Sequence, residues 1–464
     1  MYSKLNRIIT NSLAGTSLAG TLIMGFAGPT LADTTDDMIK TFITKGYLTE
    51  EEGSLMLERR KGEMEVSAKK ARSNPTMEVG KKGLVIKGPD GDFSIKLGGR
   101  MHADFSTHNG DDSLAGGKEA VDGSEIRRGR IALSGTVYKD FDYMIETDFG
   151  GDKVSVKDLF LTYHGFNAPL DFTVGHQKHA MSMEIQESSN DIMFTERSLV
   201  SALTVPYFDR AIGVNFKGYG DNWNVQSGIY GDSITNGAKD KDEGSGFGVR
   251  GTFAPINDKD KVLHLGANFG YRKVSEDNLA NTKATEFSYK TTNLSNLKLV
   301  DAKLNDLDSV KTGILELAGM YGPFSFQSEF AKSSVDKETG SGVDFNAYYA
   351  QVGYTLTGES RTYKGSDGEF KRLVPKSKFS LKNGTWGAWE VAARYDQVDL
   401  EDEDVNGGEE KRVSFALNWY LNEDVRLMAG YSRAFDLDGG ALKKTNGSFA
   451  DDIDVYTLRT QWAF

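Results

Sequence analysis

The feature that most constrains this chain is an alternation of apolar and polar residues with a period of two, from residue 84 to its end. In the first clear instance, Phe93 and Ile95 fall on one face of an extended segment, whereas Lys96 and Arg100 fall on the other. Successive side chains of a β-strand point to opposite sides, so such a segment predicts a strand with one apolar and one polar face. The alternation recurs in about sixteen segments, namely 93–105, 128–137, 141–149, 159–163, 170–174, 212–216, 223–229, 247–253, 263–271, 315–321, 324–330, 348–356, 389–395, 413–419, 425–431 and 456–464.

The connections between these segments alternate in length. Short turns such as 138–141, 219–222 and 421–424 alternate with long polar stretches such as 106–125 and 274–310. Outer-membrane barrels have short turns at one rim and long loops at the other, whereas a soluble β-sandwich needs no such asymmetry. The sequence therefore predicts an all-β fold, a transmembrane antiparallel β-barrel of about 16 strands.

Composition agrees with a barrel and excludes several other classes of protein. The 464 residues include Gly 52 and Pro 8, which suits many strands and turns, and the mean hydropathy is -0.45. A polar lumen hides the lipid-facing side of a barrel from such an average. Cys 0 excludes disulfides, thiolate metal sites and a cysteine nucleophile, and the net charge of -12 disfavours nucleic acid as a partner.

The first residues have the features of an export signal. Lys4 and Arg7 precede an apolar stretch at 13–27, and a small-residue cleavage site ends at Ala32. This order predicts a signal peptide over 1–32. The alternative, a membrane anchor, is disfavoured because the apolar stretch is short and interrupted by glycine.

Residues 33–74 have helical rather than strand spacing. Met38 and Phe42 lie four apart, and the run from Thr49 to Glu52 is a capping box that opens a second helix. We expect a short helical periplasmic extension over 33–74, with 69–74 as its linker, and the barrel over 75–464. Two roles remain open for it: a mobile polar extension, or an element for a periplasmic contact or for oligomerisation.

Several motifs resemble those of a known family. The most specific is 348–359, which reads YYAQVGYTLTGE. The others are KLGGR at 96–100, the pair Arg127-Arg128, VRGTFAP at 249–255, VLHLG at 262–266, GAWE at 387–390 and NWY at 418–420. On these motifs, residues 84–464 resemble the phosphate-selective porin O/P family of outer-membrane porins.

The resemblance implies a homotrimer of sixteen-stranded barrels, each with a third loop folded inward to narrow the pore. It implies residence in the outer membrane of a Gram-negative cell, among outer-membrane lipid and lipopolysaccharide. The last strand ends on the aromatic residue Phe464, which resembles the signal read by the barrel-assembly machinery. Small anions are the permeant solutes that the resemblance suggests.

Five arginines fall on the polar face of their segments and are expected to line the lumen: Arg100, Arg128, Arg130, Arg250 and Arg272. A guanidinium is always charged and donates in a fork that matches oxyanions, so a row of them forms a path along which anions pass. Pairing with lumen carboxylates such as Glu146 or Glu390, which would only brace the barrel, remains the alternative. We expect a mixture of both.

The third loop, at about 177–206, is where this sequence departs from the family. Phosphate-tuned members have lysines where Ile185 and Asn190 stand. The loop instead offers four acids against Arg197 and Lys178, the acids being Glu184, Glu187, Asp191 and Glu196. Such a constriction should repel phosphate at short range.

The sequence thus predicts a porin with a water-filled channel for small solutes that prefers anions such as phosphate. A general-diffusion porin without phosphate selectivity is the main alternative. An outer-membrane barrel enzyme and a structural or adhesion barrel belong to other classes, and no catalytic residue, metal site or cofactor site is evident in the sequence. A row of inward arginines distinguishes the porin from the structural barrel.

Overall fold

The computed structural model describes residues 30–72, 74–80, 83–110, 114, 121–232, 242–274, 286–304, 306–439, 442–448, 450 and 452–464. Most of the expected signal peptide lies outside these residues. The chain divides into two compact units, Met1–Pro75 and Thr76–Phe464. We describe each unit by itself.

The first unit is a pair of helices, α2 (Thr30–Thr44) and α3 (Glu50–Arg72). The expected capping box opens α3, because the Thr49 backbone N–H donates to the Glu52 carboxylate at 2.9 Å and the Glu52 N–H donates to the Thr49 hydroxyl at 3.2 Å. The expected linker at 69–74 is wrong in part, since α3 continues to Arg72. Among the described residues, no helix is long and apolar enough to span a membrane.

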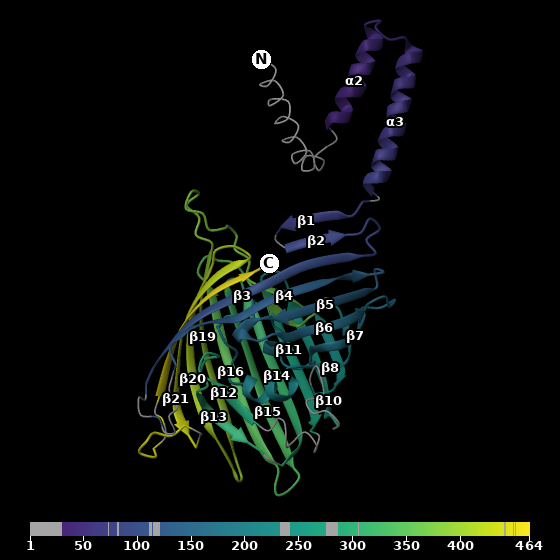
Figure 1. Cartoon of the computed structure of the whole chain (residues 1–464). Coiled ribbons are helices and arrows are strands. Elements are labelled where there is room, and N and C mark those ends of the chain that lie inside the picture. The colour runs from purple at the N-terminus through teal and green to yellow at the C-terminus, as the bar shows by residue number, and fades with distance from the viewer. Residues whose placement is uncertain are drawn as a thin grey trace, which may run out of the picture. The chain divides into compact units, whose positions relative to one another are not determined.

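The second unit is an antiparallel barrel of sixteen strands, to which the hairpin of β1 (Thr76–Gly80) and β2 (Gly83–Lys87) adds at one rim (Figure 1). The last strand pairs with the first barrel strand from Asp454↔Asn109 to Ala463↔Arg100, which closes the barrel. The barrel strands are β3 (Ser94–Asn109), β4 (Gly123–Val137), β5 (Phe141–Asp148), β6 (Ser155–Tyr163), β7 (Leu170–Lys178), β8 (Arg210–Tyr219), β9 (Trp223–Tyr230), β10 (Ser245–Asn257), β11 (Lys261–Lys273), β14 (Leu307–Tyr321), β15 (Phe324–Lys337), β16 (Val343–Thr355), β19 (Ala388–Asp402), β20 (Val405–Tyr420), β21 (Val425–Asp438) and β22 (Asp452–Ala463).

The alternation along each strand separates an apolar outside from a polar inside. In β9, Val225 and Ile229 are 49% and 64% exposed, whereas Asn224 and Gln226 on either side of Val225 are buried. In this barrel, aliphatic side chains face out and are exposed, whereas amide side chains face in and are buried. A soluble β-sandwich has the opposite arrangement, with apolar side chains inside and polar ones outside. This inversion is expected when the solvent outside is lipid.

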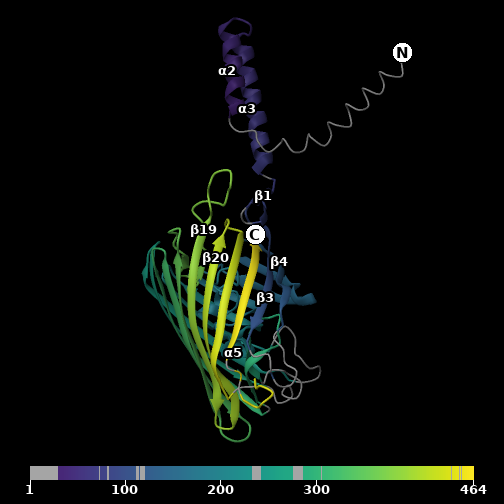
Figure 2. The same cartoon turned by 90° about the vertical axis from the view of Figure 1, so that its left-hand side faces the viewer.

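Among the residues that the structure describes, three connections fold into the barrel. Loop 3 (179–209) carries α4 (Met183–Gln186) and α5 (Ser201–Phe208); α5 is marked in Figure 2. The part of loop 5 that the structure describes (286–304) carries the hairpin of β12 (Glu286–Lys290) and β13 (Lys298–Lys303), and turn 6 (356–387) carries that of β17 (Thr362–Lys364) and β18 (Glu369–Lys371). Loops 3 and 5 form an apolar core with the wall from β14 to β19. The interior is therefore filled mainly on one side.

One rim, which we call the turn rim, carries the C-terminus and the short connections, such as 138–140 and 258–260. Turn 6 belongs to this rim but is long, so the expectation that all connections there are short is wrong. Its Phe370 packs against Met183 of loop 3, and Arg250 of β10 donates to the Gly368 carbonyl at 2.6 Å. Turn 6 thus braces loop 3 from the turn-rim side.

Candidate functional site

Loop 3 is held across the lumen by side chains of the barrel wall. Glu329 of β15 accepts hydrogen bonds from the backbone N–H groups of Met183 at 2.8 Å and Glu184 at 3.1 Å. The hydroxyls of Ser182 and Tyr349 donate to the same carboxylate at 3.2 and 2.9 Å. One buried carboxylate therefore satisfies four donors at the start of the loop, which fixes the position of α4.

The middle of loop 3 is fixed by another part of the wall. Arg426 of β21 donates to the Ile192 carbonyl and Asn418 of β20 donates to the Met193 carbonyl, each at 2.9 Å. Irregular backbone is tolerated at membrane depth only when protein or water satisfies its polar groups. These wall side chains fulfil that requirement for the loop.

We call the space left between loop 3 and the barrel wall the opening. Three of the four loop acids are turned away from it. The Glu184 carboxylate accepts the Ser198 N–H at 2.9 Å and the Ser198 hydroxyl at 2.7 Å, and Asp191 is also buried. Glu187 accepts a hydrogen bond from Gln327 of β15 at 3.2 Å, and burial raises the pKa of Glu187 to about 8. The acid-rich, phosphate-repelling constriction expected from the sequence is therefore not formed by these three residues.

Glu196, the fourth acid, lies at the opening but is neutralised there. Arg127 of β4 donates to its two carboxylate oxygens at 2.8 and 3.0 Å. Burial opposes ionisation, but Arg127 and Arg128 outweigh it and hold the pKa of Glu196 well below its usual range. This carboxylate remains charged, and its charge is compensated.

The two positions that hold lysines in phosphate-tuned members are buried in this chain. Ile185 is 2% exposed, and Asn190 lies at hydrogen-bond distance (2.9 Å) from His102 of β3. The partly exposed residues of the loop include Gln186, Ser188 and Arg197 instead. A lysine at either buried position would require loop 3 to repack before its ammonium reached the opening.

Arg197 braces the loop rather than pairing with an acid. Its guanidinium donates to the carbonyl of Glu184 at 2.9 Å and to the carbonyl of Glu187 at 3.1 Å. These hydrogen bonds occupy N–H donors of the guanidinium, but their acceptors are neutral carbonyls, which do not neutralise its charge. The positive charge of Arg197 therefore remains available to the solute path.

Arg100 and Arg130 form one network with two acids of β5. Arg130 donates to Glu146 at 2.8 Å and to Asp148 at 2.7 Å, while Arg100 donates to Glu146 at 2.7 Å. Arg100 also reaches the hydroxyl of Ser188 in loop 3 at 3.2 Å. Through Arg100, this network connects the wall to loop 3.

Arg128 differs from its neighbours because no carboxylate of the described residues forms an ion pair with it. Its nearest described hydrogen-bond partner is His102, at 3.5 Å. Like Arg130, Arg128 lines the cavity above loop 3. It is a cation that forms no direct contact with a carboxylate, although its charge helps to keep Glu196 ionised.

The structure does not bring Arg250 and Arg272 to this cavity. Arg250 is fully buried and donates to Glu316 through two nitrogens at 2.9 Å each. Arg272 binds Asp232 and the Gly231 carbonyl of the connection after β9. Both arginines brace the barrel, which is the alternative that the sequence left open.

Two cations reach the same cavity through β-bulges. Between β3 and β4, His102 pairs with Arg128 and Ala103 with Ile126, so Arg127 is the extra residue. Between β5 and β6, Glu146 pairs with Asp158 and Thr147 with Val156, so Lys157 is the extra residue. A bulge re-aims a side chain, and strict alternation therefore misses both. Only the Arg127-Arg128 doublet in the sequence hinted at the first.

We call this cavity the vestibule. It has a volume of about 450 Å³ and lies between loop 3, loop 5 and the wall from β4 to β8. Its charged lining consists of seven cations, Arg127, Arg128, Arg130, Lys157, Arg197, Arg210 and Lys290, and four acids, Asp148, Glu196, Asp209 and Glu286. Of the cations, Arg210, which the sequence did not single out, pairs with Asp158 at 3.0 Å. The vestibule is therefore electropositive.

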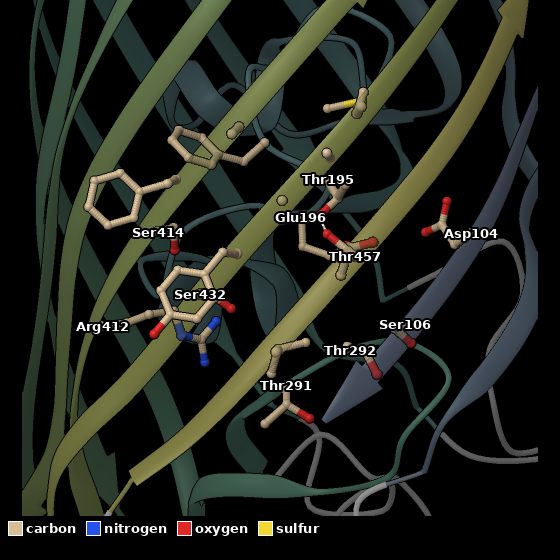
Figure 3. Close-up of a pocket in the computed structure, with 18 of the residues that line it drawn as sticks. Asp104, Ser106, Thr195, Glu196, Thr291, Thr292, Arg412, Ser414, Ser432 and Thr457 are labelled. Carbon is tan, nitrogen blue, oxygen red and sulfur yellow. Dashed lines mark hydrogen bonds between the residues drawn. The ribbon is translucent and has the colours of Figure 1, made fainter. Parts of the chain in front are cut away.

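A second opening lies on the other side of the tip of loop 3 and is much smaller. Thr195 and Glu196 of the loop face Thr457 of β22 there, with Arg412, Ser414 and other hydroxyl-bearing residues around them (Figure 3). This hollow has a volume of about 50 Å³, which holds only a few water molecules. The vestibule is the larger of these two spaces beside the loop and the better candidate for a solute path.

Comparison with known proteins agrees with this architecture. Residues 95–464 match the family model described as "Phosphate-selective porin O and P". Porin O of Pseudomonas aeruginosa is 30% identical over 83% of this chain and 91% of its own length. An uncharacterised protein of Caulobacter vibrioides is 28% identical over 81% of this chain and 75% of its own length.

Solved structures show the same type of fold. A high-pH structure of Pseudomonas putida OprB has a TM-score of 0.50 at 9% identity, covering 80% of this chain and 94% of that one. The likeness supports the barrel and nothing finer. The match over most of the sequence and the sixteen-stranded barrel with an inward third loop lead to one conclusion: the chain belongs to the phosphate-selective porin O and P family and is an outer-membrane porin, not an enzyme.

Proposed function

We propose that this porin prefers small inorganic anions and that they pass through the vestibule. The observation that carries the proposal is the lining of seven cations against four acids. Among the described residues, neither Arg128 nor Lys157 forms an ion pair with a carboxylate, whereas the acid Glu286 is paired with Lys298. The surplus charge attracts anions into a space of low dielectric constant, where each charge counts more than in water.

The same contacts argue for a modest rather than a strong preference. Carboxylates partly neutralise three of the cations, Arg127, Arg130 and Arg210, through ion pairs. An anion therefore meets several weak binding sites instead of one tight site. Conduction requires sites that bind weakly enough to release the ion. Phosphate should therefore permeate and block chloride current only weakly, because the loop lysines of phosphate-tuned members are absent.

The test is the reversal potential of single channels in planar bilayers under a salt gradient. Wild-type protein should show anion preference. The double variant Arg128→Gln/Lys157→Gln removes two vestibule charges that lack a carboxylate partner, so its anion-to-cation permeability ratio should fall about threefold or more.

Lys259→Gln and Lys382→Gln together are the matched control, because they remove the same charge from exposed positions at the turn rim. Control channels should keep the wild-type ratio. A wild-type ratio near one would favour the general-diffusion alternative. Equal shifts in the two double variants would rule out the vestibule as the origin of selectivity.

We also propose that the porin is a homotrimer whose subunits meet at the wall from β5 to β9. These five strands have only eight to ten residues, against twelve to sixteen for the other barrel strands from β10 to β22. At roughly 3.3 Å per residue and a tilt of about 45°, the short strands span only about 19 to 23 Å and fall short of an apolar band of about 25 Å. The irregular backbone that connects these short strands would then lie at membrane depth, where it is tolerated in contact with protein but not with lipid.

Native mass spectrometry in mild detergent should find three chains, and Leu161→Arg on the outer face of β6 should dissociate them. Leu317→Arg on β14 is the matched control, because both leucines are 45% exposed on the outside of the barrel. The control should stay trimeric. A trimer that survives Leu161→Arg would place the interface on another wall.

A further inference from the structure

The second half of turn 6 leaves the lumen and forms a separate surface feature. Residues 376–387, which we call the rim hairpin, are closed by a pair of backbone hydrogen bonds between Ser380 and Thr385, at 2.9 and 3.1 Å. The segment between β16 and β19, yellow-green in Figures 1 and 2, reaches past the strand ends at the rim that carries the C-terminus. Nothing in the solute path described above uses this hairpin.

The rim hairpin is fastened to the outer aromatic residues of the barrel. The ring of Phe379 lies 5.2 Å from that of Trp419 in β20, and the Trp419 indole donates to the Trp386 carbonyl at 2.7 Å. Trp419 in turn stacks on Trp389 of β19 at 4.9 Å. Aromatic residues at strand ends mark the membrane interface of a barrel. The hairpin therefore continues that interface.

Its exposed side chains are of two kinds. Leu381 and Trp386 are 76% and 57% exposed, although both are large and apolar. Lys376, Lys378 and Lys382 are exposed on the same segment. From residue 371 to residue 389 the sequence contains no carboxylate, so this part of the chain supplies no acid to neutralise them.

We propose that the rim hairpin docks on the lipid of the periplasmic leaflet, with its lysines on headgroup phosphates and its apolar side chains at the acyl boundary. Two features on the surface itself select this partner. The hairpin is continuous with the aromatic residues that face the membrane interface, and its uncompensated lysines complement anionic headgroups. A basic, aromatic segment of this kind lies in the interface plane and prefers anionic lipid.

The hairpin also lies on a wall suited to lipid contact. Its supports, β19 and β20, belong to the long-stranded part of the barrel, whereas the proposed subunit interface is the short wall from β5 to β9. The lipid proposal does not depend on anion selectivity, because the hairpin contributes no residue to the vestibule lining. Failure of one proposal therefore leaves the other intact.

The test uses the full-length protein in phosphatidylcholine vesicles that contain a minor share of phosphatidylglycerol, with one lipid or the other brominated. Bromine quenches nearby tryptophan, and the part due to Trp386 is obtained by comparison with Trp386→Phe. Brominated phosphatidylglycerol should quench Trp386 at least twofold more, per molecule of quencher, than brominated phosphatidylcholine. In Lys378→Gln/Lys382→Gln this ratio should fall to about one.

Lys259→Gln/Lys261→Gln, in the turn after β10 and at the first residue of β11, is the matched control and should keep the wild-type ratio. Unchanged single-channel conductance verifies that each variant is folded. A ratio near one for the wild type would overturn the preference for anionic lipid, as would a ratio that survives the loss of the hairpin lysines. Quenching of Trp386 by aqueous acrylamide but not by either brominated lipid would overturn the docking itself.

Discussion

Arg130→Ala is expected to weaken the anion preference of the channel strongly. Arg130 is the shared partner of Glu146 and Asp148, with distances of 2.8 and 2.7 Å. Its removal leaves Asp148 without its guanidinium partner and Glu146 with Arg100 alone. Asp148, which lines the vestibule, and Glu146 beside it in the network are then less compensated than before, so the reversal potential in a salt gradient should shift toward cation preference.

The same substitution should reduce stability. Breaking a buried ion pair by removing one partner costs about 3 to 5 kcal/mol, and the acid side chains are only 4% and 8% exposed. Arg130→Lys tests whether the charge of Arg130 or the geometry of its guanidinium matters. This variant should keep anion preference, but it should lose the simultaneous contact with Glu146 and Asp148. The variant Arg130→Ala/Glu146→Gln/Asp148→Asn should recover most of the stability. If Arg130→Ala keeps the wild-type reversal potential, this network does not contribute to selectivity.

Glu329→Ala is expected to release loop 3 from the wall. The Glu329 carboxylate accepts the N–H groups of Met183 and Glu184 and the hydroxyls of Ser182 and Tyr349. Each orphaned buried donor costs roughly 1 to 3 kcal/mol. The loop should therefore leave its observed position for part of the time.

Single-channel recordings should show conductance that rises about twofold in long, noisy openings, together with weaker anion preference. Glu338→Ala, at an exposed site just beyond the end of β15, is the matched control and should leave conductance and anion preference unchanged. Glu329→Gln keeps one acceptor oxygen and should have an intermediate effect. Quiet channels of normal conductance in Glu329→Ala would mean that other contacts position loop 3.

The barrel itself was predictable from the sequence because strand geometry is local. A period of two requires only that neighbouring side chains alternate, and lipid outside with water inside imposes that alternation on every strand. The segment 223–229, for instance, was predicted as a strand and lies in β9 (Trp223–Tyr230). The capping box from Thr49 to Glu52 was equally local, and the structure confirms it.

The site was predicted only in part. The inward face of Arg100, Arg128 and Arg130 followed from alternation, but whether each arginine meets an acid depends on neighbouring strands and on loops far away in the sequence. Arg250 is buried and donates hydrogen bonds to Glu316 of β14 and to the Gly368 carbonyl of turn 6. No spacing within β10 carries that information.

The sequence by itself determined the strands, their inward and outward faces and the family. The tertiary structure alone decided which charges face the solute path. The bulges at Arg127 and Lys157 break the alternation, because a bulge follows from the register of two strands and not from one of them. The acids Glu184 and Glu187 turn away from the opening because Ser198 and Gln327 hold them there. Charge selectivity is a sum over such long-range contacts, so it is set only when the loops close inside the barrel.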